Sequence, residues 1–129
     1  MFTADQLVAH AVGDYVLQSE WMATEKTRKS IAALAHCIFY TLPFLFITQD
    51  PYTLLVISGS HFVIDRWNLA RHVAWLKNRP WPRGCRWVEC MHNGGFHPET
   101  PRWMSGWLVI IIDNIMHVVI NGMAITYIG

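Results

Sequence analysis

Long apolar stretches, separated by short polar segments, dominate the pattern of the chain. Residues 30–48 contain no Asp, Glu, Lys or Arg, and residues 105–128 contain only Asp113 among these residue types. Each stretch has about the length of 20 residues that a helix needs to cross the hydrocarbon of a bilayer. Both therefore predict membrane-spanning helices.

Two further helices follow from weaker patterns. Residues 52–75 begin with an apolar run and end in a basic region that contains Arg66 and Arg71. In residues 4–20 the polar side chains of His10, Asp14 and Gln18 recur every fourth residue and so form one stripe of a helix. This first helix completes a bundle or, alternatively, lies partly in the membrane interface.

The pattern thus predicts an all-α fold: a membrane-embedded four-helix bundle that forms a single domain over residues 1–129. The expected helices are 4–20, 30–48, 52–75 and 105–128. Residues 78–104 are rich in Pro, Gly and Trp and predict an irregular loop at the level of the lipid headgroups. Small residues on the helix faces would allow the bundle to form homo-oligomers.

Basic residues orient this bundle. Lys26, Arg28 and Lys29 lie between the first two helices, and further arginines lie between the last two, whereas the turn at residues 49–51 has no basic residue. By the positive-inside rule, both basic connections face the cytoplasm and both termini face outward. The expected location is the inner (cytoplasmic) membrane, with several passes.

Composition narrows the classes of function. The chain is 53% hydrophobic and 15% charged, with a formal net charge of +1, which predicts no broad attraction to nucleic acid. Its three cysteines argue against a framework of disulfides. We therefore expect lipid, rather than nucleic acid, to be the main partner.

The candidate chemistry is a repeated histidine–aspartate pair. His10 and Asp14, His61 and Asp65, and the reversed pair Asp113 and His117 are each separated by four residues, which places both members on one helix face. In the predicted topology the reversal brings all three pairs to a similar depth, and His36 lies at that depth too. A common layer of this kind is unexpected for scattered polar residues.

A divalent metal would explain why these histidines and aspartates share one depth in the membrane. A charged Asp near the centre of a membrane helix costs about 2.5–3.5 kcal/mol, which coordination to a cation offsets. Mixed imidazole and carboxylate ligands favour one or two Zn²⁺ ions, with Mn²⁺ or Fe²⁺ as alternatives. The predicted ligands are His10, Asp14, His36, His61, Asp65, Asp113 and His117, and the predicted outer partners are Gln18, Arg66 and Asn121.

Structural explanations compete with each of these assignments. A single buried His–Asp pair can be an ion pair without a metal, Gln18 and Asn121 can serve as interhelical hydrogen-bond donors, and Arg66 can extend toward headgroups. A weaker second cluster occurs in the loop, where the spacing does not match the usual zinc-finger pattern. Its members are Cys85, Cys90, His92 and His97.

Four sequence elements carry a family resemblance. HAVGDYVLQSEWMA at residues 10–23, the isolated His36, HFVIDRW at 61–67 and DNIMH at 113–117 resemble a bacterial and phage family of small membrane proteins of unknown function (DUF3307). That family is related to LexA-regulated, membrane-bound metal-dependent hydrolases. The His-x-x-Gly-Asp element is also similar to zinc-dependent phospholipase C and related nucleases. The resemblance implies metal ligation by the same seven residues and suggests a phosphoester substrate.

The leading hypothesis is a membrane-embedded, metal-dependent hydrolase that acts on a phosphoester or lipid-linked substrate near the cytoplasmic leaflet. A metal would activate a bound water, and one of Asp14, Asp65 or Asp113 would act as the general base if it is not a ligand. The alternatives are an ion or proton transport module and a non-catalytic membrane protein that a metal staples together to regulate a partner.

Overall fold

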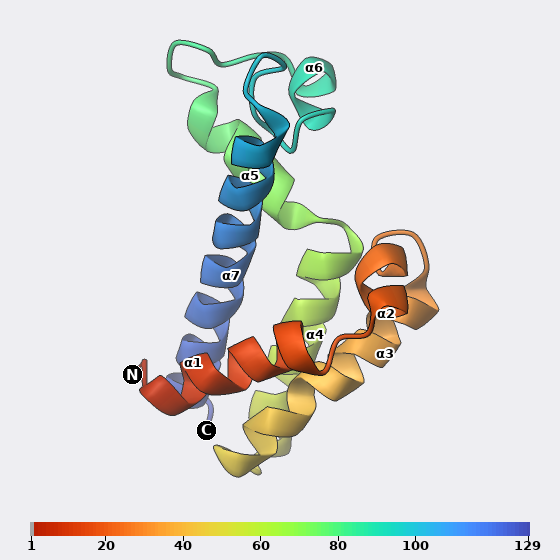
Figure 1. The fold of residues 1–129 in the computed structure, drawn as a ribbon. Coiled ribbons are helices and arrows are strands. Elements are labelled where there is room, and N and C mark those ends of the chain that lie inside the picture. Colours follow the sequence, from red (N-terminus) through yellow and green to blue (C-terminus); the bar gives the residue numbers. More distant parts are fainter. Residues whose placement is uncertain (1) are drawn as a thin grey trace. The chain divides into compact units, whose positions relative to one another are not determined.

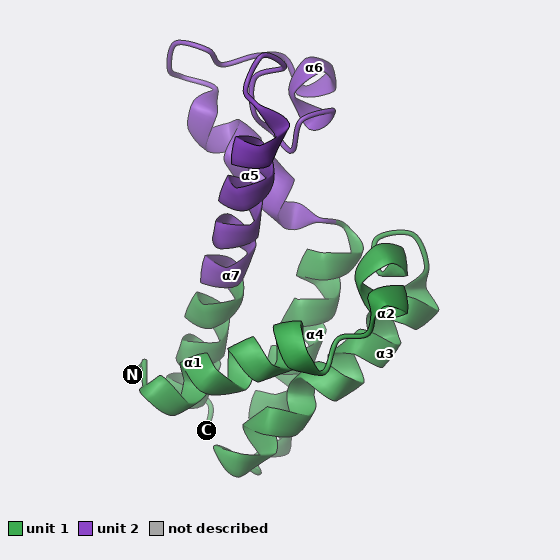
Figure 2. Cartoon of the chain, in the orientation of Figure 1, with its two compact units in different colours: residues 1–67, 117–129 green, residues 68–116 purple. Residues whose placement is uncertain are grey.

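The computed structural model describes residues 2–129, and over these residues the fold consists of helices without strands (Figure 1). The prediction of an all-α fold is confirmed. The chain divides into two compact units (Figure 2): residues 1–67 with 117–129, and residues 68–116.

The prediction of one continuous helix over residues 4–20 is wrong. The chain instead forms α1 (Ala4–Ala11) and a π-helical turn η1 (Val12–Val16). After a break, α2 (Glu20–Glu25) follows. Ser19 starts α2, since its hydroxyl oxygen accepts a hydrogen bond from the Met22 backbone N–H at 3.3 Å. Ser19 is thus the N-cap of a new helix, and the residues after it do not continue the first helix.

The second expected helix, residues 30–48, is nearly correct but changes its form. α3 runs over Ser30–Thr41, and the 3₁₀ segment η2 follows over Leu42–Phe46. Pro43 explains the change, because proline has no N–H and its ring clashes with the preceding turn of an α-helix.

The third expected helix, residues 52–75, is two helices. α4 (Pro51–Arg66) ends before Asn68, whose φ of 47° lies in the left-handed region that asparagine tolerates better than most residues, and α5 (Leu69–Asn78) follows. Asp50 starts α4: its carboxylate accepts hydrogen bonds from the N–H and hydroxyl of Thr53. These hydrogen bonds lower the pKa of Asp50.

In the first unit, α3 packs against α4, while α1 and η1 pack against η2 and α3. The apolar core of this unit consists of Ala9, Tyr40, Phe44, Ile57 and Ala124. Gln6 lies buried beside this core and donates from Nε2 to the carbonyl oxygen of Val118 at 2.6 Å. Buried polar side chains of the same helices, such as His61, lie directly next to this core.

The second unit contains α5, the short helix α6 (Trp87–Met91) and the first part of α7 (Arg102–Tyr127). The expected loop at residues 78–104 is therefore not wholly irregular. A disulfide joins Cys85 to Cys90, and buried Asn93 organises the segment after it. The Asn93 amide donates to the carbonyl oxygens of His97 and Thr100, and its Oδ1 accepts from Ser105.

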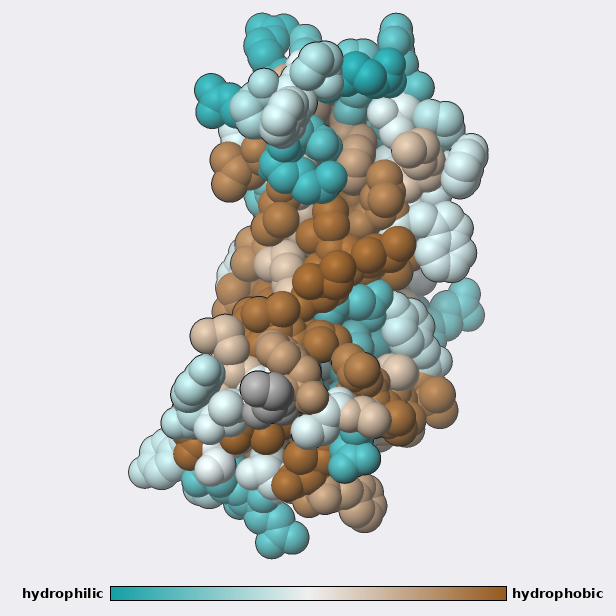
Figure 3. Space-filling model, turned by 90° about the vertical axis from the view of Figure 1, so that its left-hand side faces the viewer, coloured by the Kyte–Doolittle hydropathy of each residue, from teal (hydrophilic) through white to brown (hydrophobic). Residues whose placement is uncertain are grey.

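α7 (Arg102–Tyr127) is the candidate for membrane contact. Among the helices of residues 2–129, it alone is long and apolar enough to cross a membrane, by length and composition. Its Trp107, Ile111 and Ile115 are about half exposed or more, and apolar side chains are abundant on the face in Figure 3. One candidate span is thus supported, and the other three spans stay predictions.

Candidate metal centre

The centre of the first unit depends on a close approach at Gly13. A Cβ atom on this residue would lie 2.7 Å from Cδ2 and 3.0 Å from the carbonyl oxygen of Tyr40. Glycine therefore lets η1 lie directly against α3. Asp14, the next residue, is buried there and reaches His36 on α3, with 3.1 Å between Oδ1 and Nε2.

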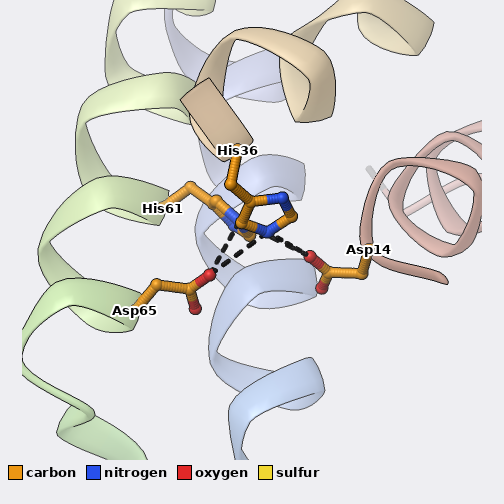
Figure 4. A group of neighbouring side chains, drawn as sticks. All are labelled: Asp14, His36, His61 and Asp65. Atoms are coloured by element: carbon orange, nitrogen blue, oxygen red, sulfur yellow. Dashed lines mark hydrogen bonds and ion pairs between the residues drawn. The ribbon is translucent and has the colours of Figure 1, made fainter. Parts of the chain in front are cut away.

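Four side chains from three elements point to one spot (Figure 4). They are Asp14 from η1, His36 from α3, and His61 and Asp65 from α4. His36 Nε2 lies 2.8 Å from His61 Nε2 and 3.2 Å from Asp65 Oδ2. His61 Nε2 lies 3.4 Å from Asp14 Oδ1 and 3.1 Å from Asp65 Oδ2. All four residues are buried.

Hydrogen bonds within this group cannot satisfy all of these atoms. An imidazole nitrogen carries at most one proton, so His36 Nε2 can donate to only one of the three atoms around it. The remaining contacts bring lone pairs together: the two imidazole nitrogens, which lie 2.8 Å apart, and the two carboxylate oxygens are all acceptors when they carry no proton. A cation at their centre removes this conflict, because each lone pair then faces positive charge.

The separations agree with coordination distances. Bonds of about 2.0–2.1 Å place neighbouring ligand atoms about 3.3–3.4 Å apart around a tetrahedral ion and about 2.8–3.0 Å apart around an octahedral one. The separations given above run from 2.8 to 3.4 Å. The buried cluster could therefore hold a metal ion.

His117 contacts two members of this group. Its Nε2 is 3.2 Å from Asp65 Oδ1, and its Nδ1 is 3.1 Å from His61 Nδ1. If His117 donates from Nε2 to Asp65, its Nδ1 accepts from the Nδ1–H of His61. His61 Nε2 is then left with a lone pair that faces the centre. Such outer partners fix the tautomer of metal-binding histidines.

Tyr40, which the sequence interpretation missed, connects the outer residues. Its ring stacks on His61, with centroids 3.6 Å apart and planes at 10°. Its hydroxyl oxygen accepts from Asn121 Nδ2 at 2.6 Å and lies 2.8 Å from His10 Nδ1, to which it can donate. Tyr40 follows His36 by four residues, the same spacing as the histidine–aspartate pairs, and this signal was available.

Lys26 is the second residue that the sequence interpretation missed. Its Nζ lies 2.7 Å from Asp65 Oδ2, and its side chain keeps 18% of its surface exposed while that of Asp65 keeps 2%. The lysine comes from the segment after α2 and carries a positive charge to the edge of the centre. Its neighbours in sequence predict only a solvated basic connection, so spacing gave no indication of this contact.

The remaining predicted residues lie at varied positions. His10 Nδ1 is 3.6 Å from Asp14 Oδ2, and Gln18 Nε2 donates to the Asp14 carbonyl oxygen at 3.0 Å. Arg66 donates to the carbonyl oxygen of Thr27 and the hydroxyl of Ser30, not to the centre. Asp113 belongs to the second unit, one helical turn before His117 on α7, and its role as ligand or base stays a prediction.

The second cluster predicted from sequence differs. Cys85 and Cys90 form a disulfide and therefore offer no thiolates. His92 is exposed and His97 is partly exposed, and within residues 2–129 neither belongs to a group of candidate metal ligands. The structure thus gives this loop no metal site.

Comparison with known proteins gives one result. A family model described as a protein of unknown function (DUF3307) matches residues 2–128. No curated protein and no solved structure matches the chain. Any functional assignment must therefore come from the geometry of the site.

Proposed function

The chain belongs to the DUF3307 family of proteins of unknown function, and from its buried centre we propose that it is a metal-dependent hydrolase of phosphoester or lipid-linked substrates. The observation that carries the proposal is the convergence of four potential ligand atoms, from Asp14, His36, His61 and Asp65: each histidine nitrogen lies 2.8–3.4 Å from the other three atoms, and all four lie within 4.8 Å of one another. Zn²⁺ is the first ion to test, with Mn²⁺ and Fe²⁺ as alternatives.

Charge supports metal binding. Two buried carboxylates face one ammonium group, that of Lys26, so the centre lacks positive charge when its histidines are neutral. Burying an uncompensated carboxylate is strongly unfavourable. A divalent cation reverses the balance and makes the loaded centre electropositive, which suits an anionic phosphoester.

The chemistry would be ordinary ester hydrolysis. A bound metal supplies a water of lowered pKa and polarises a phosphoryl oxygen. The water oxygen bonds to phosphorus, the ester P–O bond breaks, and the leaving oxygen takes up the proton that the water gives up. In this scheme Asp14, His36, His61 and Asp65 hold the ion, while His117 and Tyr40 keep the His61 ring in place.

We propose that this activity takes place at a membrane. α7 supplies one helix of sufficient length and apolar character, and Val8, Phe46 and Leu55 on the first unit are also more than half exposed. Exposed apolar side chains of this size are typical of surfaces that contact lipid or another protein. A multi-pass arrangement in the inner membrane remains part of the proposal.

A second candidate function has its own supporting observation. Four protein ligands complete a tetrahedral zinc site, and sites closed in this way are usually structural. The protein would then be a metal-stapled membrane protein without catalysis. An octahedral ion in the same centre would instead keep two positions for water and substrate.

The test begins with protein purified in detergent without chelators, in wild-type form and as His61→Asn. Elemental analysis should find about one metal ion per wild-type chain and much less in the variant. Wild-type protein should hydrolyse bis-(p-nitrophenyl) phosphate or a short-chain phospholipid, and the variant should not. Bound metal without turnover of either substrate would favour the structural candidate, and clean, folded wild-type protein without metal would refute both.

A further inference from the structure

Lys26 stands at the edge of the metal centre and differs from the ligands in its exposure. Its Nζ contacts Asp65 Oδ2 at 2.7 Å, and that same oxygen lies 3.1 Å from His61 Nε2 and 3.2 Å from His36 Nε2. The four central residues are buried, whereas the Lys26 side chain reaches solvent. Lys26 therefore contacts a proposed ligand and solvent at the same time.

The contact between Lys26 and Asp65 changes in strength when a cation binds. A divalent ion on Asp65 Oδ2 repels an ammonium group that lies 2.7 Å from that oxygen. The four proposed ligands are buried side chains of packed helices, which leaves them little room to move. The lysine side chain is long, flexible and partly solvated, so it is the group that moves.

Arg66 limits how far the lysine can move. It directly follows Asp65 on α4, and it donates from Nη1 to the Thr27 carbonyl oxygen at 2.6 Å and from Nε to the Ser30 hydroxyl at 3.2 Å. These bonds tie the backbone beside Lys26 to the helix that carries Asp65. The backbone that carries Lys26 is thus kept beside the centre, so its ammonium group stays within the reach of one lysine side chain even when it leaves the carboxylate.

We propose that Lys26 forms an oxyanion subsite, in which its ammonium group binds a phosphate-type oxygen of a ligand held at the metal. This inference rests on the proposed function and names the recognised chemistry: a phosphate group, on a lipid headgroup or on a soluble ester. With metal bound, two carboxylates face a divalent ion and an ammonium group, so a further anion neutralises the excess charge.

The experiment measures the binding of inorganic phosphate to metal-loaded protein in detergent by isothermal titration calorimetry. Lys26→Gln keeps a hydrogen-bond donor without the charge and should weaken phosphate binding about tenfold or more. Lys26→Arg should stay within about threefold of wild type. The matched control is Lys29→Met in the same segment, whose lysine pairs with Glu25 and is 58% exposed; it should leave the affinity for phosphate unchanged.

Metal affinity, measured on the same proteins, separates the two proposals. Lys26→Gln should bind metal as tightly as wild type or more tightly, because an ammonium group no longer competes for Asp65. Equal phosphate affinity in wild type and Lys26→Gln, with metal bound in both, would overturn the subsite and leave the metal centre standing. Absence of metal from folded wild-type protein would refute the proposed function itself.

A second arm identifies the source of the phosphate. Dihexanoyl phosphatidic acid and glycerol 3-phosphate are compared as ligands, below the micelle-forming concentration of the lipid. Tighter binding of the lipid, with the same loss in Lys26→Gln, supports a headgroup, and equal binding supports a soluble ester. Binding of both that does not depend on Lys26 contradicts the proposal.

Discussion

Two regions of the chain carry potential metal ligands, and they differ in what holds those ligands. In the first unit, helices and a π-helical turn place Asp14, His36, His61 and Asp65 around one buried spot. In the second unit, the segment of residues 85–97 has two cysteines and two histidines, but the cysteines are bonded to each other and His92 is exposed. Residue type alone therefore does not make a site.

The difference lies in the backbone. A helix fixes the direction of every side chain, so a separation of four residues converts directly into proximity on one face. The 85–97 segment contains a short helix, positive-φ glycines at 94 and 95 and local hydrogen bonds, so spacing in sequence says little about direction.

The largest effect should come from exchanging the same residue type in each region. His61→Asn should reduce metal affinity by at least about 100-fold, since it removes a buried nitrogen at the centre and the ring that Tyr40 stacks on. His92→Asn should leave the affinity unchanged. A competition titration against a chromogenic chelator measures both affinities. An equal loss of metal affinity in the two variants would contradict the difference between the two regions.

Metal removal and disulfide reduction should act independently. Transfer from metal at 100 times its Kd into EDTA should lower the free energy of unfolding by about 2.7 kcal/mol. Reduction of Cys85–Cys90 should leave the bound metal in place, because the disulfide belongs to the other unit. Urea unfolding and elemental analysis under the four combinations of conditions check this, and release of metal upon reduction would contradict it.

The close approach of helices in the first unit should be sensitive to a single methyl group. Gly13→Ala introduces a Cβ 2.7 Å from Tyr40 Cδ2 and should destabilise the fold by about 1–3 kcal/mol, while also weakening metal binding. The matched control is Gly59→Ala on α4, where nothing lies within 4 Å. That change should stabilise the helix by about 0.5–1 kcal/mol. Thermal unfolding of both variants measures the difference. An equal gain in stability in both variants would contradict the close approach of η1 to α3 at Gly13.

The smallest effect concerns the start of the helix that carries His61 and Asp65. The pKa of Asp50 is lowered by its hydrogen bonds from Thr53, so its contribution to stability is complete above the usual carboxyl pKa of about 4 and is lost as the pH falls through the lowered value. Asp50→Asn should keep the cap without this dependence. The Tm of wild type should fall a few degrees further than that of the variant between pH 5 and pH 2.5. Parallel Tm profiles would contradict it.

Helical periodicity is short-range, so the sequence predicted which polar side chains lie close together on one helix. His61 with Asp65 needs only one regular turn, and α4 supplies it. α7 was predicted within three residues at each end, since a long apolar run has few alternative structures. His36 was identified as an isolated polar residue in an apolar stretch, and its burial at the centre agrees with that interpretation.

The remaining features depend on tertiary structure or on single backbone angles. The break at Asn68 comes from one left-handed residue, and the change to η2 comes from Pro43, whose effect a hydropathy pattern does not register. Lys26 reaches Asp65 across 39 positions of sequence, and no local pattern encodes such a pairing. The roles of His10, Asp113 and His117 as ligands stay predictions.

The π-helical turn at Val12–Val16 has a consequence for evolution. Such a turn is equivalent to inserting one residue into an α-helix, and it is most often found at functional positions. Deleting a residue between Ala11 and Leu17 would convert this stretch into an ordinary helix and rotate the Asp14 carboxylate away from His36. Relatives that keep the metal centre should therefore show no gap here, and a one-residue gap in an alignment would identify lineages that have lost it.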